Sequence, residues 1–226
     1  MKNQEQGVKE RAAKEQTLKT GTTDFVPFDI TVCGLDELEA HIEDGRSHVL
    51  SILDPDWPMP PVLSQPGRHA WLGLRFHDVL EVSRHQLAPQ QSHVEHVLAF
   101  GETLHRSPPP DAHLLVHCHM GISRSVAAMT LILAQARPDR PAAEALAEVH
   151  RIRPRAWPNL RMLEMGDTLL GLKGSLVLAA HRHYGKVIQE NPNVAEEMTS
   201  YGRKREVDAG RAAILAASLD RRAAVN

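Results

Sequence analysis

Short apolar runs alternate with helical periods between residues 25 and 171, and this alternation constrains the fold more than any other feature of the sequence. Four segments have the length and apolar content of strands: residues 28–33, 48–53, 70–76 and 112–117. Five segments have the periodicity or the boundary residues of helices: residues 36–42, 89–106, 123–136, 141–152 and 158–170. Strands that alternate with helices predict an α/β domain, with a central, mostly parallel β-sheet of about four to five strands flanked by helices.

The helix expected at 123–136 is apolar on nearly all sides, which predicts a central, buried position. The strand expected at 112–117 has the composition of a buried strand, and only a short loop separates the two segments. We therefore expect a loop that joins a central strand to a buried helix.

Flanking segments extend this domain, which we assign to residues 25–171. Residues 1–24 read as a polar N-terminal tail without an aromatic residue. Residues 172–226 read as a C-terminal helical extension or tail. Within them Leu176, Ala180, Tyr184 and Ile188 recur at a spacing of four, which predicts a helix that lies on the domain. The polar segment from about residue 190 could be a helix, a dimer element or a frayed tail, and the oligomeric state is left open.

Charge and hydrophobicity exclude several function classes. The chain has 26 Lys and Arg against 28 Asp and Glu, so its net charge is −2. Without a basic surplus, no nucleic-acid or membrane-surface partner is expected. The first 24 residues lack an apolar stretch of signal-peptide length, and no later stretch approaches the ~18 apolar residues of a membrane span. The sequence therefore predicts a cytoplasmic protein with no membrane partner.

Metal chemistry is not expected either, although the 14 histidines suggest it at first. Two cysteines are too few for a disulfide framework or a four-cysteine zinc site. His93 and His96 lie one helical turn apart and could share a metal, but the polar face of an amphipathic helix explains the pair as well. The sequence therefore predicts no metal and no other cofactor. A basic run at Arg151, Arg153 and Arg155 is expected to be solvated surface.

The loop between the buried strand and the buried helix has the features of an anion-binding site. Successive backbone N–H groups and a helix N-terminus place positive potential in such a loop. Gly121 permits tight backbone curvature there. A cysteine at this place, Cys118, would be stabilised as a thiolate, and Arg124 offers a planar pair of donors to phosphate oxygens. These residue types together predict nucleophilic attack on a phosphate monoester.

The order His-Cys, five residues, then Arg-Ser resembles the signature loop of the protein tyrosine phosphatase superfamily. The segment 116–125, taken with Pro-Asn-Leu-Arg-Met-Leu-Glu-Met-Gly-Asp at 158–167, resembles compact bacterial members that are related to dual-specificity phosphatases. The resemblance implies that Cys118 is the nucleophile of a phosphocysteine mechanism and that Arg124 binds the phosphoryl group. It implies that Ser125 assists departure of the Cys118 sulfur and that His117 sets the thiolate environment. Substrate-binding backbone amides would come from the rest of the loop: His119, Met120, Gly121, Ile122, Ser123 and Arg124.

The resemblance also implies an aspartate general acid some thirty to forty residues before the cysteine. Asp78 lies 40 residues upstream of Cys118, just after an expected strand, and we assign it this role. Asp54 and Asp56 are rivals at 64 and 62 residues upstream, spacings that look too long, although their loop could line the cleft. Cys33 is expected to be a small buried strand residue, with a redox bridge to Cys118 as the alternative that the resemblance suggests.

The sequence thus predicts a metal-independent, cysteine-dependent phosphomonoesterase. Its expected substrate is phosphotyrosine in proteins, with phosphoserine or phosphothreonine as further candidates, or a small phosphomonoester. One alternative is the same chemistry on a phosphoinositide, an inositol phosphate or an RNA 5′-triphosphate. Lipid-directed relatives often carry lysines inside the loop, so the absence of lysine here disfavours a lipid substrate. His119 leaves a polyphosphate substrate as an alternative. Two further alternatives are sulfur transfer and an inactive phosphate-recognition module. The His-Cys-x5-Arg-Ser sequence disfavours sulfur transfer.

Overall fold

The structure, a computed structural model, describes residues 23–43, 47–64 and 70–223. All but two residues of the expected N-terminal tail, 1–24, therefore lie outside the described residues. The described chain contains one four-stranded sheet with the order β1-β4-β2-β3, in which all neighbouring strands are parallel. The strands are β1 (Asp29–Cys33), β2 (His48–Leu53), β3 (Ala70–Arg75) and β4 (His113–His117). The predicted α/β class and its parallel sheet are confirmed.

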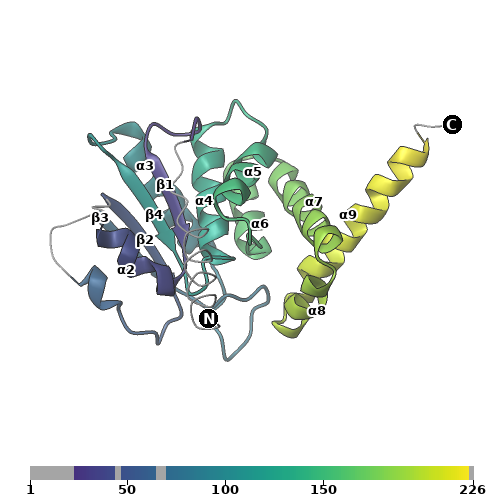
Figure 1. Ribbon diagram of the computed structural model, residues 1–226, viewed down its shortest axis with the longest axis horizontal. Helices are drawn as coiled ribbons and strands as arrows, with labels where there is room; N and C mark the ends of the chain where they lie inside the picture. The colour runs from purple at the N-terminus through teal and green to yellow at the C-terminus, as the bar shows by residue number, and fades with distance from the viewer. Residues whose placement is uncertain (1–22, 44–46, 65–69, 224–226) are drawn as a thin grey trace, which may run out of the picture.

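Helices cover both faces of the sheet (Figure 1). One face packs against α2 (Leu35–Glu43) and the 3-10 helix η1 (Pro61–Leu63). The opposite face packs against a larger layer: α3 (Gln91–Arg106), α4 (Arg124–Ala136), α5 (Ala142–Ile152) and α6 (Leu160–Leu169). Side chains alternate along the strands, so that Val49 and Leu115 face α2 whereas Leu50 and Val116 face the larger layer. Burial on both faces explains why these strands are continuously apolar.

Helix α4 occupies the centre of the larger layer, as its all-round apolar sequence predicted. Every residue from Arg124 to Ala134 is buried, and α4 contacts α3, α5, α6 and the sheet. Its N-terminus follows β4, the strand between β1 and β2, after six loop residues. This placement fixes the loop of residues 118–123 between a central strand and a buried helix.

The C-terminal extension consists of α7 (Ser175–Glu190), α8 (Asn193–Ser200) and α9 (Lys204–Ala223). Helix α7 packs on α5 and α6 through Leu176, Ala180, Tyr184 and Ile188, the four residues whose spacing predicted a helix on the domain. Helix α9 packs along α7, and its C-terminal half projects from the rest of the molecule (Figure 1). The buried residues of α7 belong to the same apolar core as α4 and α6.

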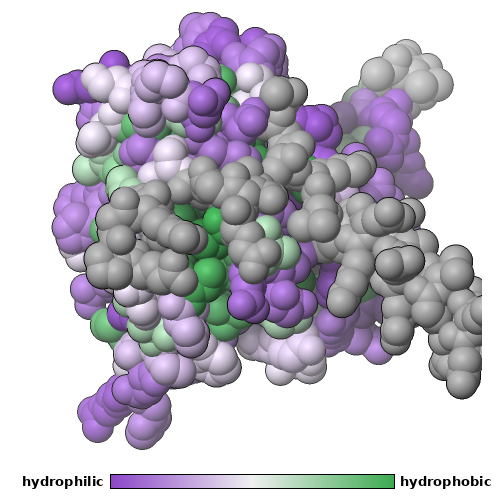
Figure 2. Space-filling view, turned by 60° about the vertical axis from the view of Figure 1, so that its left-hand side comes forward, coloured by the Kyte–Doolittle hydropathy of each residue, from purple (hydrophilic) through white to green (hydrophobic). Residues whose placement is uncertain are grey.

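Figure 2 shows a mostly hydrophilic face in which hydrophobic atoms gather near the centre. None of the helices in the described part of the chain is both long and apolar enough to cross a lipid bilayer.

Candidate active site

The loop of residues 118–123 turns sharply against the end of β1. Gly121 has a φ of +66°, and a Cβ at this position would lie 2.4 Å from the carbonyl carbon of Cys33. Only glycine fits such a close approach in this left-handed conformation. The loop is also tied to the start of α2, because Leu35 donates its backbone N–H to the carbonyl oxygen of His119 at 2.9 Å. The left-handed conformation of Gly121 and the contact with the end of β1 therefore fix the tight curvature of the loop, which the sequence predicted.

Cys118 lies at the base of this loop with 2% of its surface exposed. Its Sγ is 3.2 Å from the Oγ of Ser125, in the first turn of α4. The positive end of the helix dipole lies at the same place, because α4 begins at Arg124. Burial lowers the pKa of the neighbouring His117 to about 4, so its imidazole is neutral at neutral pH. The structure brings Cys118 and Ser125 together, whereas neither ring nitrogen of His117 has a hydrogen-bond partner among the described residues.

The guanidinium of Arg124 is held rigidly beside the loop. Its Nη1 donates to Oδ1 of Asp54 and to the carbonyl oxygen of Phe76, both at 2.6 Å. Its Nε is buried and has no hydrogen-bond partner among the described residues. A buried donor without a partner is costly, which makes Arg124 receptive to an anion in the loop.

Asp54, the rival that the spacing disfavoured as general acid, does line the site. Its carboxylate pairs with Arg124, and its backbone N–H donates to Nε2 of His119 at 3.2 Å. Burial and the charge of Arg124 lower the pKa of His119, and its ring packs edge-on against Trp57. Since Nε2 accepts a hydrogen bond, His119 is a neutral ring in this arrangement rather than a cation for a polyphosphate.

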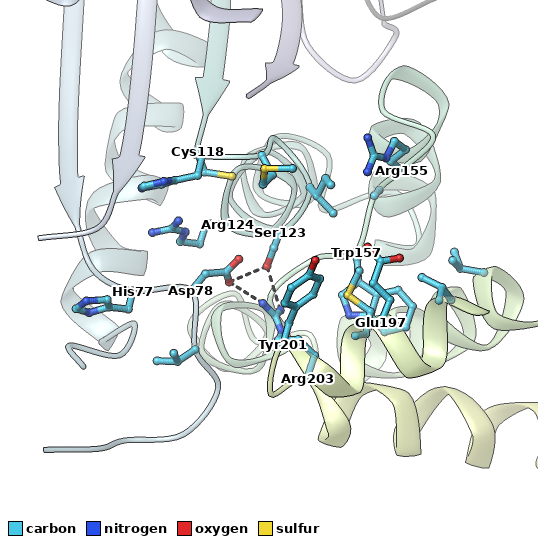
Figure 3. Close-up of a pocket in the computed structure, with 18 of the residues that line it drawn as sticks. His77, Asp78, Cys118, Ser123, Arg124, Arg155, Trp157, Glu197, Tyr201 and Arg203 are labelled. Carbon is cyan, nitrogen blue, oxygen red and sulfur yellow. Dashed lines mark hydrogen bonds and ion pairs between the residues drawn. The ribbon is translucent and has the colours of Figure 1, made fainter. Parts of the chain in front are cut away.

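Asp78 lies across the loop from Asp54, and hydrogen bonds hold its carboxylate through one oxygen (Figure 3 shows those from Ser123 and Arg203). Its Oδ1 accepts hydrogen bonds at 2.8 Å from Ser123 Oγ, Asn159 Nδ2 and Arg203 Nη1. Its Oδ2 accepts none from the residues that the structure describes. Burial raises the pKa of Asp78, but the charges of Arg203 and Arg124 and the two neutral hydrogen bonds lower it by more, so this pKa lies below its ordinary value.

Two residues of the C-terminal extension belong to this arrangement, and sequence reasoning missed both. Arg203 precedes α9 and contacts both Asp78 and Ser123, while Glu206 in the first turn of α9 pairs with Arg203. Asp78 and Arg203 are 125 positions apart, and no local pattern marks Arg203 among the other arginines. Asn159 was part of the resemblance, but its contact with Asp78 was not anticipated.

Arg153 corrects the expectation that its basic run is solvated surface. Its side chain is 9% exposed, and Arg153 donates to the carbonyl oxygens of Met120 and Gly121, both at 2.9 Å. It also pairs with Glu37, which accepts the backbone N–H of Gly34. The C=O and N–H groups of one peptide point in opposite directions. Because these two carbonyl groups face Arg153, the N–H groups of the same peptides face the interior of the loop.

A pocket of about 750 Å³ opens above Cys118. The loop, Asp54 and Asp78 form one side of it, as Figure 3 shows for Cys118 and Asp78. The extension forms the other side through α7, α8 and the segment that follows: Val187, Glu190, Asn191, Val194, Glu197, Met198, Tyr201 and Arg203. Among residues 23–43, 47–64 and 70–223, no group of three or more His, Cys, Asp or Glu side chains is arranged to hold a metal.

The fold is that of the tyrosine and dual-specificity phosphatases. DUSP15 has a TM-score of 0.50 at 18% identity, covering 70% of this chain and 93% of that chain. A mutant form of Tk-PTP has a TM-score of 0.50 at 19% identity, covering 69% of this chain and 96% of that chain. Human DUSP28 has a TM-score of 0.48 at 20% identity, covering 64% of this chain and 92% of that chain. No protein-family model and no curated protein matches the sequence.

These comparisons confirm the resemblance at the level of the fold. At 18–19% identity the fold does not by itself assign an activity. The chemistry therefore has to be inferred from the arrangement of Cys118, Arg124 and Asp78.

Proposed function

We propose that this protein is a cysteine-dependent phosphomonoesterase that hydrolyses phosphotyrosine in proteins through a phosphocysteine intermediate. The observation that carries the proposal is the convergence of three groups on one pocket. Cys118 lies at the base, and, among the described residues, Arg124 has a buried donor without a partner and Asp78 keeps one oxygen free. Such a set supplies a nucleophile, an anion binder and a proton donor.

In the first step the Cys118 thiolate attacks phosphorus, forming a sulfur–phosphorus bond while the bond to the tyrosine oxygen breaks. Arg124 and the backbone N–H groups of the loop hold the phosphoryl oxygens as charge shifts onto them. The protonated Oδ2 of Asp78 gives its proton to the departing tyrosine oxygen. The products of this step are the free tyrosine side chain and phosphocysteine.

In the second step Asp78, now ionised, accepts a proton from water as the water oxygen attacks phosphorus. The sulfur–phosphorus bond breaks and inorganic phosphate forms. Ser125, at 3.2 Å from the sulfur, donates a hydrogen bond that stabilises the departing thiolate. The same aspartate acts as acid and then as base, so the cycle needs no cofactor.

The pocket supports a protein phosphomonoester over a polyphosphate. The base at Cys118 is nearly fully buried, so a long aromatic side chain such as phosphotyrosine is suited to reach it. On the side of the extension, Val187, Val194 and Met198 offer apolar surface between polar residues, which suits an aromatic ring. His119 is neutral, which weakens the feature that favoured a polyphosphate.

The test is hydrolysis of p-nitrophenyl phosphate and phosphotyrosine peptides by the full chain, with a chelator present. We expect turnover by the natural protein and a loss of at least about 10⁴-fold in Cys118→Ser, because the nucleophile is removed. Full activity of Cys118→Ser would contradict the proposal. A matched control is Cys33→Ser, which changes the other cysteine and leaves the nucleophile in place.

The substrate class is tested by a panel of phosphotyrosine and phosphoserine peptides, a phosphoinositide, an inositol phosphate and a 5′-triphosphorylated RNA. We expect the highest kcat/KM with phosphotyrosine peptides. A higher kcat/KM with any of the last three would overturn the substrate assignment and keep the chemistry. Binding of phosphopeptide without turnover would instead indicate a phosphate-recognition module.

A further inference from the structure

We infer that Arg203, supplied by the C-terminal extension, is a positioning residue that orients the general acid Asp78 for proton transfer. This inference rests on the proposed function and deepens it, because it makes the extension part of the catalytic apparatus. Its basis is a continuous chain of contacts from Asp78 through Arg203 to Glu206 (Figure 3 shows the contacts of Asp78 with Ser123 and Arg203).

Arg203 is built into the protein from two sides. Toward the site its Nη1 donates to Oδ1 of Asp78 at 2.8 Å, and its Nη2 donates to Oγ of Ser123 at 3.0 Å. Toward the interior its Nε and Nη2 form a two-point pair with Glu206 at 2.9 and 2.7 Å. The Arg203 side chain is only 6% exposed, so its guanidinium is fixed in one plane.

Glu206 anchors Arg203 to the body of the domain. Its side chain has no exposed surface. Besides Arg203 it accepts the backbone N–H of Leu160 at 2.9 Å and the indole N–H of Trp157 at 2.5 Å. Leu160 is the first residue of α6, and Asn159 directly before it is another donor to Asp78. The acid is thus held by groups whose own positions are set by a buried carboxylate.

The distribution of hydrogen bonds on Asp78 explains what this arrangement achieves. All three donors act on Oδ1: Arg203, Ser123 and Asn159. Three donors on one oxygen fix the plane of the carboxyl group and leave the proton to Oδ2. A general acid transfers its proton efficiently only when its donor oxygen is already within reach of the leaving group.

The charge of Arg203 also lowers the pKa of Asp78, so the pH profile provides a second way to test the contact between them. Cations face Asp78 from two elements, Arg203 before α9 and Arg124 at the start of α4, and His119 lies across the loop as a neutral ring. The other carboxylates that line the pocket are Asp54, which is itself paired with Arg124, and Glu190 and Glu197 on the side of the extension. Removal of Arg203 takes away the larger attraction, so the pKa of Asp78 rises and the decline of kcat/KM at high pH moves to higher pH.

The experiment compares Arg203→Met with the natural protein on two substrates, p-nitrophenyl phosphate and phenyl phosphate. Phenol, like the tyrosine side chain with its pKa of about 10, is a poor leaving group and depends strongly on the acid. We expect the pH-independent kcat/KM, which is corrected for the protonated fraction of Asp78, to fall about 30-fold with phenyl phosphate and at most about threefold with p-nitrophenyl phosphate, part of the 10²–10⁴-fold that general acids contribute. Arg203→Lys keeps the charge, so it should keep the natural pH profile and recover part of the rate.

Controls separate positioning from folding. Arg203→Met leaves Glu206 buried without its cation, so Arg203→Met with Glu206→Gln is measured in parallel. Arg211→Met, on the exposed side of α9, is the matched control and should match the natural protein on both substrates. In an Asp78→Asn background Arg203→Met should cost little more, because residues that act through one group are not additive.

Several results would overturn the positioning role. Equal losses on both substrates in Arg203→Met and in the double variant would assign Arg203 a structural role only. An active natural protein with an Arg203→Met variant equal to Arg211→Met would also exclude it, with the proposed function intact. If no substrate is turned over, an NMR titration of the Asp78 carboxyl still decides: an unchanged pKa in Arg203→Met contradicts the inference, and a raised pKa supports the contact.

Discussion

The two sides of the pocket are held in position by different means. The nucleophile side is one contiguous segment, residues 118–125, whose shape follows from its glycine, the end of β4 and the start of α4. The acid side is assembled from residues far apart in the sequence: Asp78, Ser123, Asn159 and Arg203. A motif can encode the first side, whereas only the complete fold can provide the second.

Each side nevertheless depends on one buried arginine. Arg153 binds two carbonyl groups of the loop and pairs with Glu37, all within residues 25–171. Arg203 binds the acid and pairs with Glu206, from beyond that range. The two arginines should therefore affect different parts of the reaction, and mutations can separate them.

The largest effect among these tests is expected for Asp78→Asn, which removes the proton donor but keeps the shape. We expect kcat to fall by about 10²–10⁴-fold on a phosphotyrosine peptide. The pKa of Asp78 is held below its ordinary value, so the natural protein should be most active at acidic pH and decline as pH rises through that pKa. The variant should lose this decline. The measurement is a pH profile of kcat/KM, and an unchanged high-pH limb in Asp78→Asn would assign the acid elsewhere, with Asp54→Asn as the comparison.

A smaller loss, about 10²-fold, is expected for Gly121→Ala, which distorts the loop. The new Cβ would lie 2.4 Å from the backbone of Cys33, so the loop amides must shift, and each misplaced oxyanion donor costs about 10²-fold. Unlike a defect at the acid, this loss should be equal for phenyl and p-nitrophenyl phosphate. Competitive inhibition by inorganic phosphate should weaken in parallel. Tight phosphate binding by Gly121→Ala would show that the loop tolerates the change.

Arg153→Met should lower kcat about 10-fold on both substrates, because it loosens the loop that serves every leaving group. It also leaves Glu37 without its cation, so the melting temperature should fall. The direct comparison is Arg203→Met, whose loss depends on the leaving group. If both variants showed the same ratio between the two substrates, the division of the pocket into two independently supported sides would be wrong.

The smallest effect is expected for Tyr184→Phe in α7. This change removes one buried hydrogen bond, from the Tyr184 hydroxyl to the carbonyl oxygen of Pro158, and should cost about 1 kcal/mol of stability. Chemical denaturation measures this cost, and kcat/KM should stay within about twofold on both substrates. A loss that depended on the leaving group would mean that any loosening of the extension disturbs the acid, so that Arg203 would have no particular role.

Much of the fold could be read from the sequence because its signals are local. Four apolar runs became the four strands, and the all-round apolar segment became α4. The positions of the main candidate site residues were also predictable. Cys118, Arg124 and Asp78 line one pocket, and Ser125 contacts Cys118 beneath it. A strand–loop–helix unit and the end of a strand define where these residues lie.

The rest depended on contacts between distant segments. Arg153 and Arg203 are ordinary arginines in the sequence, and only the packing of α5 and α9 shows which carbonyl or carboxylate each one meets. Asp54 was set aside only as general acid, because of its distance along the chain, and its ion pair with Arg124 was not anticipated; β2 and β4 are neighbours and bring their ends together. Spacing along a chain is a poor guide where adjacent parallel strands are far apart in sequence.

The buried carboxylate of Glu206 has a consequence for how genetic variants of this protein should be interpreted. It caps the first turn of α6 and holds Arg203, so both depend on residues beyond position 200. A frameshift or stop codon near position 200 would leave the His-Cys-x5-Arg-Ser sequence untouched while removing the support for Asp78. Judged by its motif, such an allele would be classed as functional, although the proposed general acid would have lost its anchor.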